Sequence, residues 1–332
     1  MVVGMQCAGM AFSSALNIVL NPAAGMDPNA LSGFQLAANY WESKLTNPVA
    51  VNIDVGFSAL GPNILGQSGS SVLGFTASSV LGALNYRASS ANDLLAVGNF
   101  PALSAAQGIG FLTQANTEGG SKLVSLDNND STNNVALALT SANARALGWN
   151  PGSSTHVDAT ITFSSSFFWD YDQRDGVGAG LQDFVGVAIH EMGHAFGFVS
   201  GVDDVDYYIT HPMDLDGYAV FSTLDLFRYS APGTLDLAAG DQSYFSLDGG
   251  KTNLGLFSTG ALNGDGRQAS HWKDNLGLGI MDPTANPAGQ ANTPSELDLI
   301  AFDVIGWNII PEPSSGILLA AGLLCLLARR RR

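Results

Sequence analysis

The pattern of hydrophobic and polar positions predicts a regular first half of the chain. Alternation with a period of two predicts strands over residues 49–57 ("VAVNIDVGF") and 156–165 ("HVDATITFSS"), and "LNIVLNP" (16–22) also reads as a strand. Apolar residues at helical spacing predict a helix over 29–46. The Ser- and Gly-rich stretch 66–90 indicates no clear element.

Residues 132–149 are expected to be helical in their second half, and a stronger helix is predicted over 181–196. Its apolar stripe consists of Leu181, Phe184, Val185, Ala188, Met192, Ala195 and Phe196. Asp183 is a candidate N-cap, and Gly197 is well placed as the left-handed residue that ends the helix.

The pattern weakens in the second half of the chain. Residues 202–266 hold many Asp and Gly and are expected to form loops and short hairpins, such as "SYFSLDGGKTNLGLFS". A closing helix is predicted from "NTPSELDLIAFDVIGW", with Thr293 as N-cap, Pro294 at the first position and Glu296 in a capping box. The predicted fold class is α+β: a sheet with helices, then an irregular half closed by a helix.

Composition excludes several function classes. The 332 residues carry 29 Asp plus Glu against 13 Lys plus Arg, a net charge of −16, so no basic footprint for nucleic acid is present. Cys7 and Cys325 are the two cysteines, one near each end. The body therefore has no internal disulfide, and a metal there must use His, Asp, Glu or water.

The two ends suggest export. Residues 1–15 are apolar and end in small residues, so we interpret them as the remnant of a signal peptide. The tail 311–332 reads "PEPSSGILLAAGLLCLLARRRR", in which a Pro-Glu-Pro motif precedes an apolar run and four arginines. A helix over 316–328 would span roughly 20 Å, short of a hydrocarbon core of about 30 Å, so we expect transient membrane association, with the arginines on the cytoplasmic side.

This tail resembles the PEP-CTERM sorting signal of Gram-negative bacteria. The resemblance implies export, recognition by an exosortase-type sorting enzyme and cleavage near 311–313. The body is then expected at the cell surface or outside the cell after this processing.

The segment "VAIHEMGHAFGFVSG" (187–201) carries candidate chemistry. His190 and His194 lie one helical turn apart on a common face, off the apolar stripe, so their imidazoles can converge on one ion. Glu191 is rotated by about 100° from His190, so its carboxylate can reach water held at the ion. A catalytic zinc site needs a third protein ligand and one open position. The alternative is two polar residues on an exposed helix face.

The third ligand must come from far along the chain. No glutamate lies between His194 and Glu296, which excludes a thermolysin-type ligand, and the position used in compact metzincins is Ser200. The remaining candidates are His211, His271 and, more weakly, Asp203, Asp204 and Asp206. The flanking sequence favours His271, because Met281 follows it ten residues later in "GIMDP", a setting suited to a tight turn.

"HEMGHAFGF" followed by a distant "SHW" and "IMDP" resembles the leishmanolysin-like branch of the metzincins. The chain is similar to exported bacterial zinc metalloproteases that pair this motif with a PEP-CTERM tail. The resemblance implies a metzincin-like zincin domain over 16–308, with a mixed sheet and active-site helix in 16–198 and the third ligand and Met-turn in 199–308. It also implies residue roles: His190, His194 and His271 bind Zn²⁺, Glu191 is the general base, Gly197 makes the turn and Met281 is the Met-turn methionine.

The leading hypothesis is an exported zinc-dependent endopeptidase that hydrolyses peptide bonds of a protein or peptide substrate with a zinc-activated water. Its cleft is expected between the two halves, with the motif helix at its back. The alternatives are a non-catalytic matrix or adhesion protein with a structural zinc, and a metallohydrolase for non-peptide amides. The aspartates within 203–216 and the segment 263–266 could bind Ca²⁺, although solvated loops are the default. His156 is expected at the surface or in a position that supports the metal ligands. Tyr207, Tyr208 and Tyr218, which a role in stabilising the oxyanion brings to mind, are near the motif in sequence only.

Overall fold

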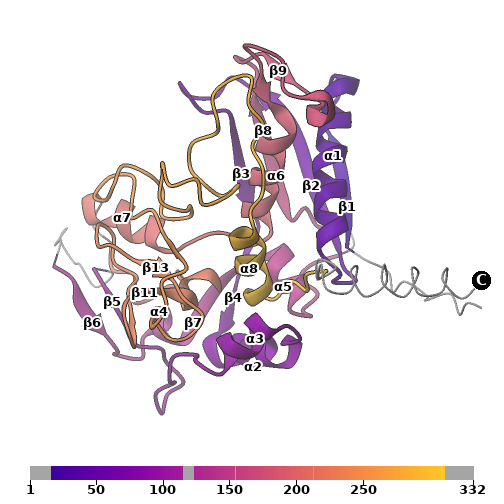
Figure 1. Cartoon of the computed structure of the whole chain (residues 1–332). Coiled ribbons are helices and arrows are strands. Elements are labelled where there is room, and N and C mark those ends of the chain that lie inside the picture. Colours follow the sequence, from indigo (N-terminus) through magenta and orange to yellow (C-terminus); the bar gives the residue numbers. More distant parts are fainter. Residues whose placement is uncertain (1–15, 115–122, 154, 212, 311–332) are drawn as a thin grey trace, which may run out of the picture.

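A computed structural model describes residues 16–114, 123–153, 155–211 and 213–310. The signal-peptide remnant and the tail 311–332 lie outside the described residues. The fold is mixed α and β with several small sheets, as the α+β prediction required. Figure 1 shows the largest sheet beside two long helices, with the second half of the chain gathered next to it.

The largest sheet has four strands in the order β1-β2-β8-β3. Strands β1 (Asn17–Pro22), β2 (Ala50–Ser58) and β8 (Ala159–Ser164) run parallel, and β3 (Gly66–Ser70) pairs antiparallel with β8 at the edge. The three predicted strands are therefore confirmed. The edge strand lies in the stretch 66–90 that gave no prediction, because its sequence "GQSGS" has no apolar residue and therefore no apolar pattern.

Helices α1 (Pro28–Lys44) and α6 (Phe184–Ala195) pack against each other and against this sheet (Figure 1). Phe34 of α1, Phe163 of β8 and Phe184 of α6 meet in one aromatic cluster, with ring centroids 4.3 to 5.0 Å apart. The indole of Trp41 donates a 3.1 Å hydrogen bond to the carbonyl of Ile189, in the middle of α6. This core fixes α6 relative to the sheet.

Shorter elements follow the edge strand. The first group comprises β4 (Val72–Thr76), α2 (Ala77–Arg87), α3 (Ala91–Val97), β5 (Phe111–Thr113), β6 (Ser125–Asp127), α4 (Thr132–Val135), β7 (Ala136–Thr140) and α5 (Ser141–Ala146). Strands β4 and β7 pair antiparallel, as do β5 and β6. The expected helix in the second half of 132–149 is α5, and a strand precedes it. The connection from β8 to α6 contains β9 (Trp169–Asp170), a 3₁₀ turn η1 (Gln173–Asp175) and β10 (Gln182–Asp183).

The second half is less irregular than its sequence suggested. It contains α7 (Val202–Thr210), a 3₁₀ turn η2 (Leu224–Phe227) and a four-stranded sheet of β11 (Arg228–Ala231), β12 (Thr234–Leu235), β13 (Tyr244–Phe245) and β14 (Gly255–Leu256). The predicted hairpin is confirmed by the antiparallel pair β13 and β14. The prediction of loops was wrong for α7, because two of its aspartates, Asp203 and Asp206, bind distant backbone groups instead of water.

The closing helix α8 (Glu296–Val304) is present, but it begins later than predicted. Its N-cap is Ser295 and not Thr293: the Ser295 hydroxyl accepts from the Asp298 N–H, and Asp298 accepts from the Ser295 N–H. The reciprocal pair is a capping box in which Asp298, rather than Glu296, supplies the carboxylate. Asp298 is completely buried and also binds the indole of Trp272, so tertiary contacts select this register.

Candidate metal centre and active-site cleft

Helix α6 is held at both ends. The predicted N-cap is confirmed, since Asp183 accepts a 3.0 Å hydrogen bond from the Gly186 N–H. Its carboxylate also accepts from the Asn292 N–H at 2.7 Å, which connects the start of α6 to the segment before α8. At the other end Gly197 has a φ of +109°, a conformation that favours glycine, and the chain turns away there.

His190, His194 and His271 meet at one point. Their Nε2 atoms are separated by 3.1 Å (His190 to His194), 3.1 Å (His194 to His271) and 3.3 Å (His271 to His190). Two nitrogens that bind one zinc tetrahedrally at about 2.0–2.1 Å lie roughly 3.3 Å apart. Among the described residues, these three form the one group of His, Cys, Asp or Glu side chains close enough to share a metal ion.

The outer nitrogen of each ring faces a backbone carbonyl. Nδ1 of His190 lies 2.6 Å from the carbonyl oxygen of Ile280, and Nδ1 of His194 lies 2.7 Å from that of Phe198. Nδ1 of His271 lies 3.3 Å from the Gln268 oxygen. Because a carbonyl only accepts, Nδ1 carries the proton in each ring and Nε2 presents its lone pair to the centre.

Burial keeps these rings neutral. It lowers the pKa of His190, and together with the neighbouring His190 it lowers the pKa of His194 to about 3. The pKa of His271 is also far below its usual value, from burial first and from the other two rings second. Three lone pairs pointed at one another repel unless a cation lies between them, so the donor set fits a zinc ion.

Glu191 lies beside the triad, against the edge strand. Its side chain is 6% exposed. A Cβ atom at Gly66 of β3 would lie 2.9 Å from Oε1 of Glu191, so only glycine leaves this space free. Burial raises the pKa of Glu191 to about 8, which makes the carboxylate a strong proton acceptor whenever it is ionised.

Met281 lies under the helix that carries two of the histidines. It is completely buried, and a Cβ atom at Gly193 would lie 2.6 Å from its sulfur, so the side chain packs on α6 at Gly193. The turn closes with a 3.3 Å hydrogen bond from the Asp282 N–H to the Gly279 carbonyl. The same segment supplies the Ile280 carbonyl that orients His190.

An open cleft of about 1410 Å³ leads to the three histidines. Strand β3 lines one side and residues 277–295 line the other, with the face of α6 that carries His190, Glu191 and His194 at the back. The cleft thus lies between the two halves of the chain, where the sequence placed it. Tyr207, Tyr208 and Tyr218 do not line it, and no other described tyrosine does either.

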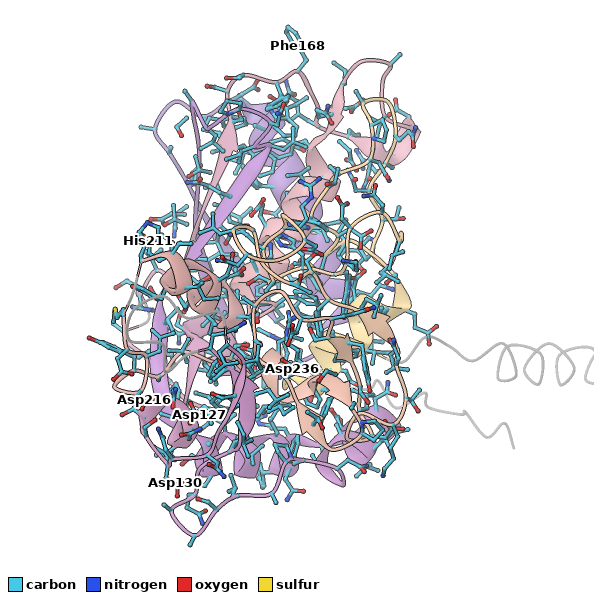
Figure 2. All side chains as sticks on the ribbon, turned by 90° about the vertical axis from the view of Figure 1, so that its left-hand side faces the viewer. Asp127, Asp130, Phe168, His211, Asp216 and Asp236 are labelled. Atoms are coloured by element: carbon cyan, nitrogen blue, oxygen red, sulfur yellow. The ribbon has the colours of Figure 1, made fainter. Side chains whose placement is uncertain are left out.

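The remaining candidates do not belong to the metal group, although Asp204 lines the same cleft. His211 is exposed and stacks on Tyr207, and Figure 2 shows it at the surface. His156 is partly buried and packs beside Gly152. The carboxylates of Asp203 and Asp206 bind backbone N–H groups, so neither belongs to the metal group.

The sequence did not predict a role for two residues near the site. Gly66, which faces Glu191, lies in a Ser- and Gly-rich stretch where one glycine looks like any other. Asn292, which joins the cleft wall to the cap of α6, lies between Pro287 and Pro294, and its surroundings read as a loop. The sequence offered one indication of a role for Asn292: it is a polar residue just before the predicted closing helix.

Comparison with known proteins identifies the tail. Residues 310–332 match the PEP-CTERM protein-sorting motif. The motif implies recognition by an exosortase-type sorting enzyme, export and sorting to the cell surface in Gram-negative bacteria, as the tail sequence predicted. No curated protein and no solved structure matches the chain. Within the residues that the structure describes, no helix is long and apolar enough to cross a membrane.

Proposed function

We propose that the protein is an exported zinc-dependent endopeptidase of metzincin-like fold. The observation that carries this proposal is the convergence of three neutral imidazoles, with Nε2 separations of 3.1 to 3.3 Å, beside a buried carboxylate at the back of an open cleft. His190, His194 and His271 would hold the ion, and Met281 would form the turn beneath it. When bound, zinc supplies Lewis-acid chemistry that polarises a carbonyl group and acidifies water.

Glu191 is the proposed general base. It takes the proton of the attacking water as the C–O bond forms, and it passes that proton to the nitrogen of the leaving amine as the peptide C–N bond then breaks. Its position fits this role, because the carboxylate lies next to both the triad and the cleft. Burial of a carboxylate costs folding free energy, and a structural metal site has no use for it.

The edge strand offers a place for an extended substrate. Strand β3 pairs with β8 on one side, and no described strand pairs with its other side. Residues of β3 line the cleft together with Glu191. A peptide can bind such an edge by main-chain hydrogen bonds, which favours peptide substrates over small amides.

Casein hydrolysis tests the proposal when it is measured together with zinc content. The wild type should cleave casein and contain one zinc per chain, whereas Glu191→Gln should retain the zinc and lose at least about a hundredfold in kcat. Equal inertness of both proteins with zinc in place would favour the alternative, a matrix or adhesion protein with a structural zinc. Cleavage of small amides but not of casein would favour the non-peptide metallohydrolase.

A further inference from the structure

The segment that carries His271 is fixed by a carboxylate of another element. Asp203, in the first turn of α7, accepts hydrogen bonds from the Ala269 N–H at 2.6 Å and from the Ser270 N–H at 3.0 Å. Its Oδ2 also accepts from the Ser270 hydroxyl. Asp203 therefore binds the two residues that immediately precede His271, although it lies 66 and 67 positions away from them in the chain.

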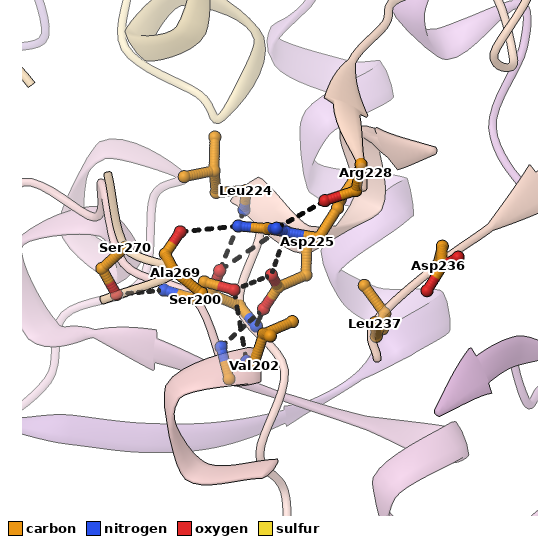
Figure 3. Close-up of polar contacts among 12 residues, drawn as sticks. Ser200, Val202, Leu224, Asp225, Arg228, Asp236, Leu237, Ala269 and Ser270 are labelled. Carbon is orange, nitrogen blue, oxygen red and sulfur yellow. Dashed lines mark hydrogen bonds and ion pairs between the residues drawn. The ribbon is translucent and has the colours of Figure 1, made fainter. Parts of the chain in front are cut away.

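A buried arginine holds the same segment from the other side. Arg228 is 1% exposed and donates to the Ala269 carbonyl at 2.6 Å (Figure 3). Its Nε lies 3.8 Å from Oδ1 of Asp225. Asp225 in turn accepts from the Ser200 hydroxyl at 2.5 Å and from the Gly201 N–H at 2.8 Å, just beyond the end of the motif helix.

These contacts form one buried network that runs from the exit of α6 to the third histidine. The backbone beyond the ring is held as well, because the Ser258 N–H donates to the His271 carbonyl at 3.0 Å. His194 and His271 lie 77 positions apart, and closing such a long loop costs conformational entropy. Without the network, the bond between His271 and the metal alone would have to offset this cost.

We propose that Asp203 and Arg228 are positioning residues that hold His271 at the metal centre before the ion binds. This inference rests on the proposed function, because it takes the three histidines to be zinc ligands. Neither residue belongs to the group of side chains close enough to share a metal ion. Asp203 fixes the backbone ahead of the ligand, and Arg228 supplies the compensating positive charge and binds the Ala269 carbonyl. Together they bring His271 to His190 and His194.

Asp203→Asn tests the proposal, and Asp206→Asn is its matched control. The asparagine amide would place N–H donors against the Ser270 N–H, so the segment should loosen. Asp206 lies on the same helix, is 3% exposed and accepts from the Leu262 N–H at 2.8 Å and the Asn263 N–H at 2.7 Å, away from His271. The two variants thus lose equivalent interactions, and only Asp203→Asn affects the ligand segment.

We expect Asp203→Asn to weaken zinc binding about 10- to 100-fold, as loss of groups that support a ligand does in other metal sites. Asp206→Asn should keep the wild-type zinc Kd even if its thermal midpoint falls equally. With Co²⁺ in place of zinc, the visible absorption of Asp203→Asn should shift toward that of His271→Ala. A wild-type Kd and spectrum in Asp203→Asn, or an equal loss of affinity in Asp206→Asn, would overturn the inference.

A second readout separates this inference from the proposed function. In metal-free protein, the imidazole NMR signal of His271, assigned with His271→Ala, should move and broaden in Asp203→Asn and stay unchanged in Asp206→Asn. An unmoved signal in Asp203→Asn contradicts the positioning role whether or not zinc binds. Wild-type protein that binds no zinc would overturn the proposed function, and this NMR comparison would still decide whether Asp203 positions His271.

Discussion

The backbone N–H of Ser200 donates a 2.9 Å hydrogen bond to the hydroxyl of Ser270, across 70 positions of the chain. Ser200 occupies the place where a compact metzincin would carry its third ligand, and Ser270 directly precedes His271. The chain therefore returns, 70 positions later, to the point that it left after the motif helix. His271 therefore lies next to the Ser200 segment in space, although it is far from Ser200 in sequence.

Replacement of single histidines should distinguish the ligands from the other candidate. Zinc content should fall from about one per chain to near zero in alanine variants of His190, His194 or His271, because two imidazoles hold the ion far more weakly than three. His211→Ala should retain the ion, since its ring lies at the surface on Tyr207. Metal analysis after dialysis measures both. Retention of zinc without His271 but loss without His211 would reverse the assignment.

Gly66→Ala should impair catalysis without removing zinc. The new Cβ would lie 2.9 Å from Oε1 of Glu191, so the carboxylate must move. We expect kcat to fall about 10- to 100-fold, within the range for a displaced general base. Gly69→Ala is the control on the same strand, because nothing lies within 4 Å of its added Cβ. Equal kcat values for the two variants in the casein assay would contradict the proposed position of the base.

Gly193→Ala should destabilise the protein through Met281. The added Cβ would lie 2.6 Å from the Met281 sulfur and 3.2 Å from the ring of Phe302, in a core without free space. Overpacking of this kind costs about 1–3 kcal/mol. Gly82→Ala in α2 meets nothing within 4 Å and should instead gain about 0.5–1 kcal/mol from helix propensity. Urea unfolding of metal-free protein measures both free energies, and a neutral Gly193→Ala would show that the packing is looser than described.

Asp303 should make the stability of the protein depend on pH. Burial raises its pKa from 3.8 to about 6, although the Ser90 hydroxyl donates to it and opposes the shift. Between these pH values the folded protein keeps a proton on Asp303 that the unfolded chain has released, so the contribution of Asp303 to stability falls as pH rises, by at most about 1.4 kcal/mol per pH unit.

Asp303→Asn cannot ionise and still accepts from Ser90. Its free energy of unfolding should therefore rise relative to that of the wild type as pH increases from 3.8 to about 6, and the difference should be constant at higher pH. Urea titrations with chelator present keep metal binding out of the comparison. Parallel pH profiles for the two proteins would show that the carboxyl of Asp303 titrates normally.

The sequence determined the local features around the motif. Spacing alone placed His190 and His194 on one face of a helix with Asp183 as its N-cap, because helical periodicity and capping depend on neighbours within one or two turns. The parallel strands β2 and β8 were visible for the same reason, since alternation repeats every two residues.

Tertiary structure decided the features in which distant residues meet. Helix α7 reads as a polar loop in sequence, and it is a helix whose Asp203 and Asp206 satisfy backbone groups more than fifty positions away. The predicted start of α8 was wrong because Asp298 accepts a hydrogen bond from the indole of Trp272 in addition to its place in the capping box with Ser295.

His271 shows most clearly which features depend on sequence and which depend on tertiary structure. Sequence could only rank His271 above His211 and the aspartates, because nothing local records which ring will face a helix 77 residues earlier. The fold makes that choice through the contacts of Asp203, Asp225 and Arg228. Asp225 and Arg228 are buried charges, which must be paired and hydrogen-bonded, and Arg228 also donates to the Ala269 carbonyl while Asp203 accepts from the Ala269 N–H. These contacts leave His271 beside His190 and His194.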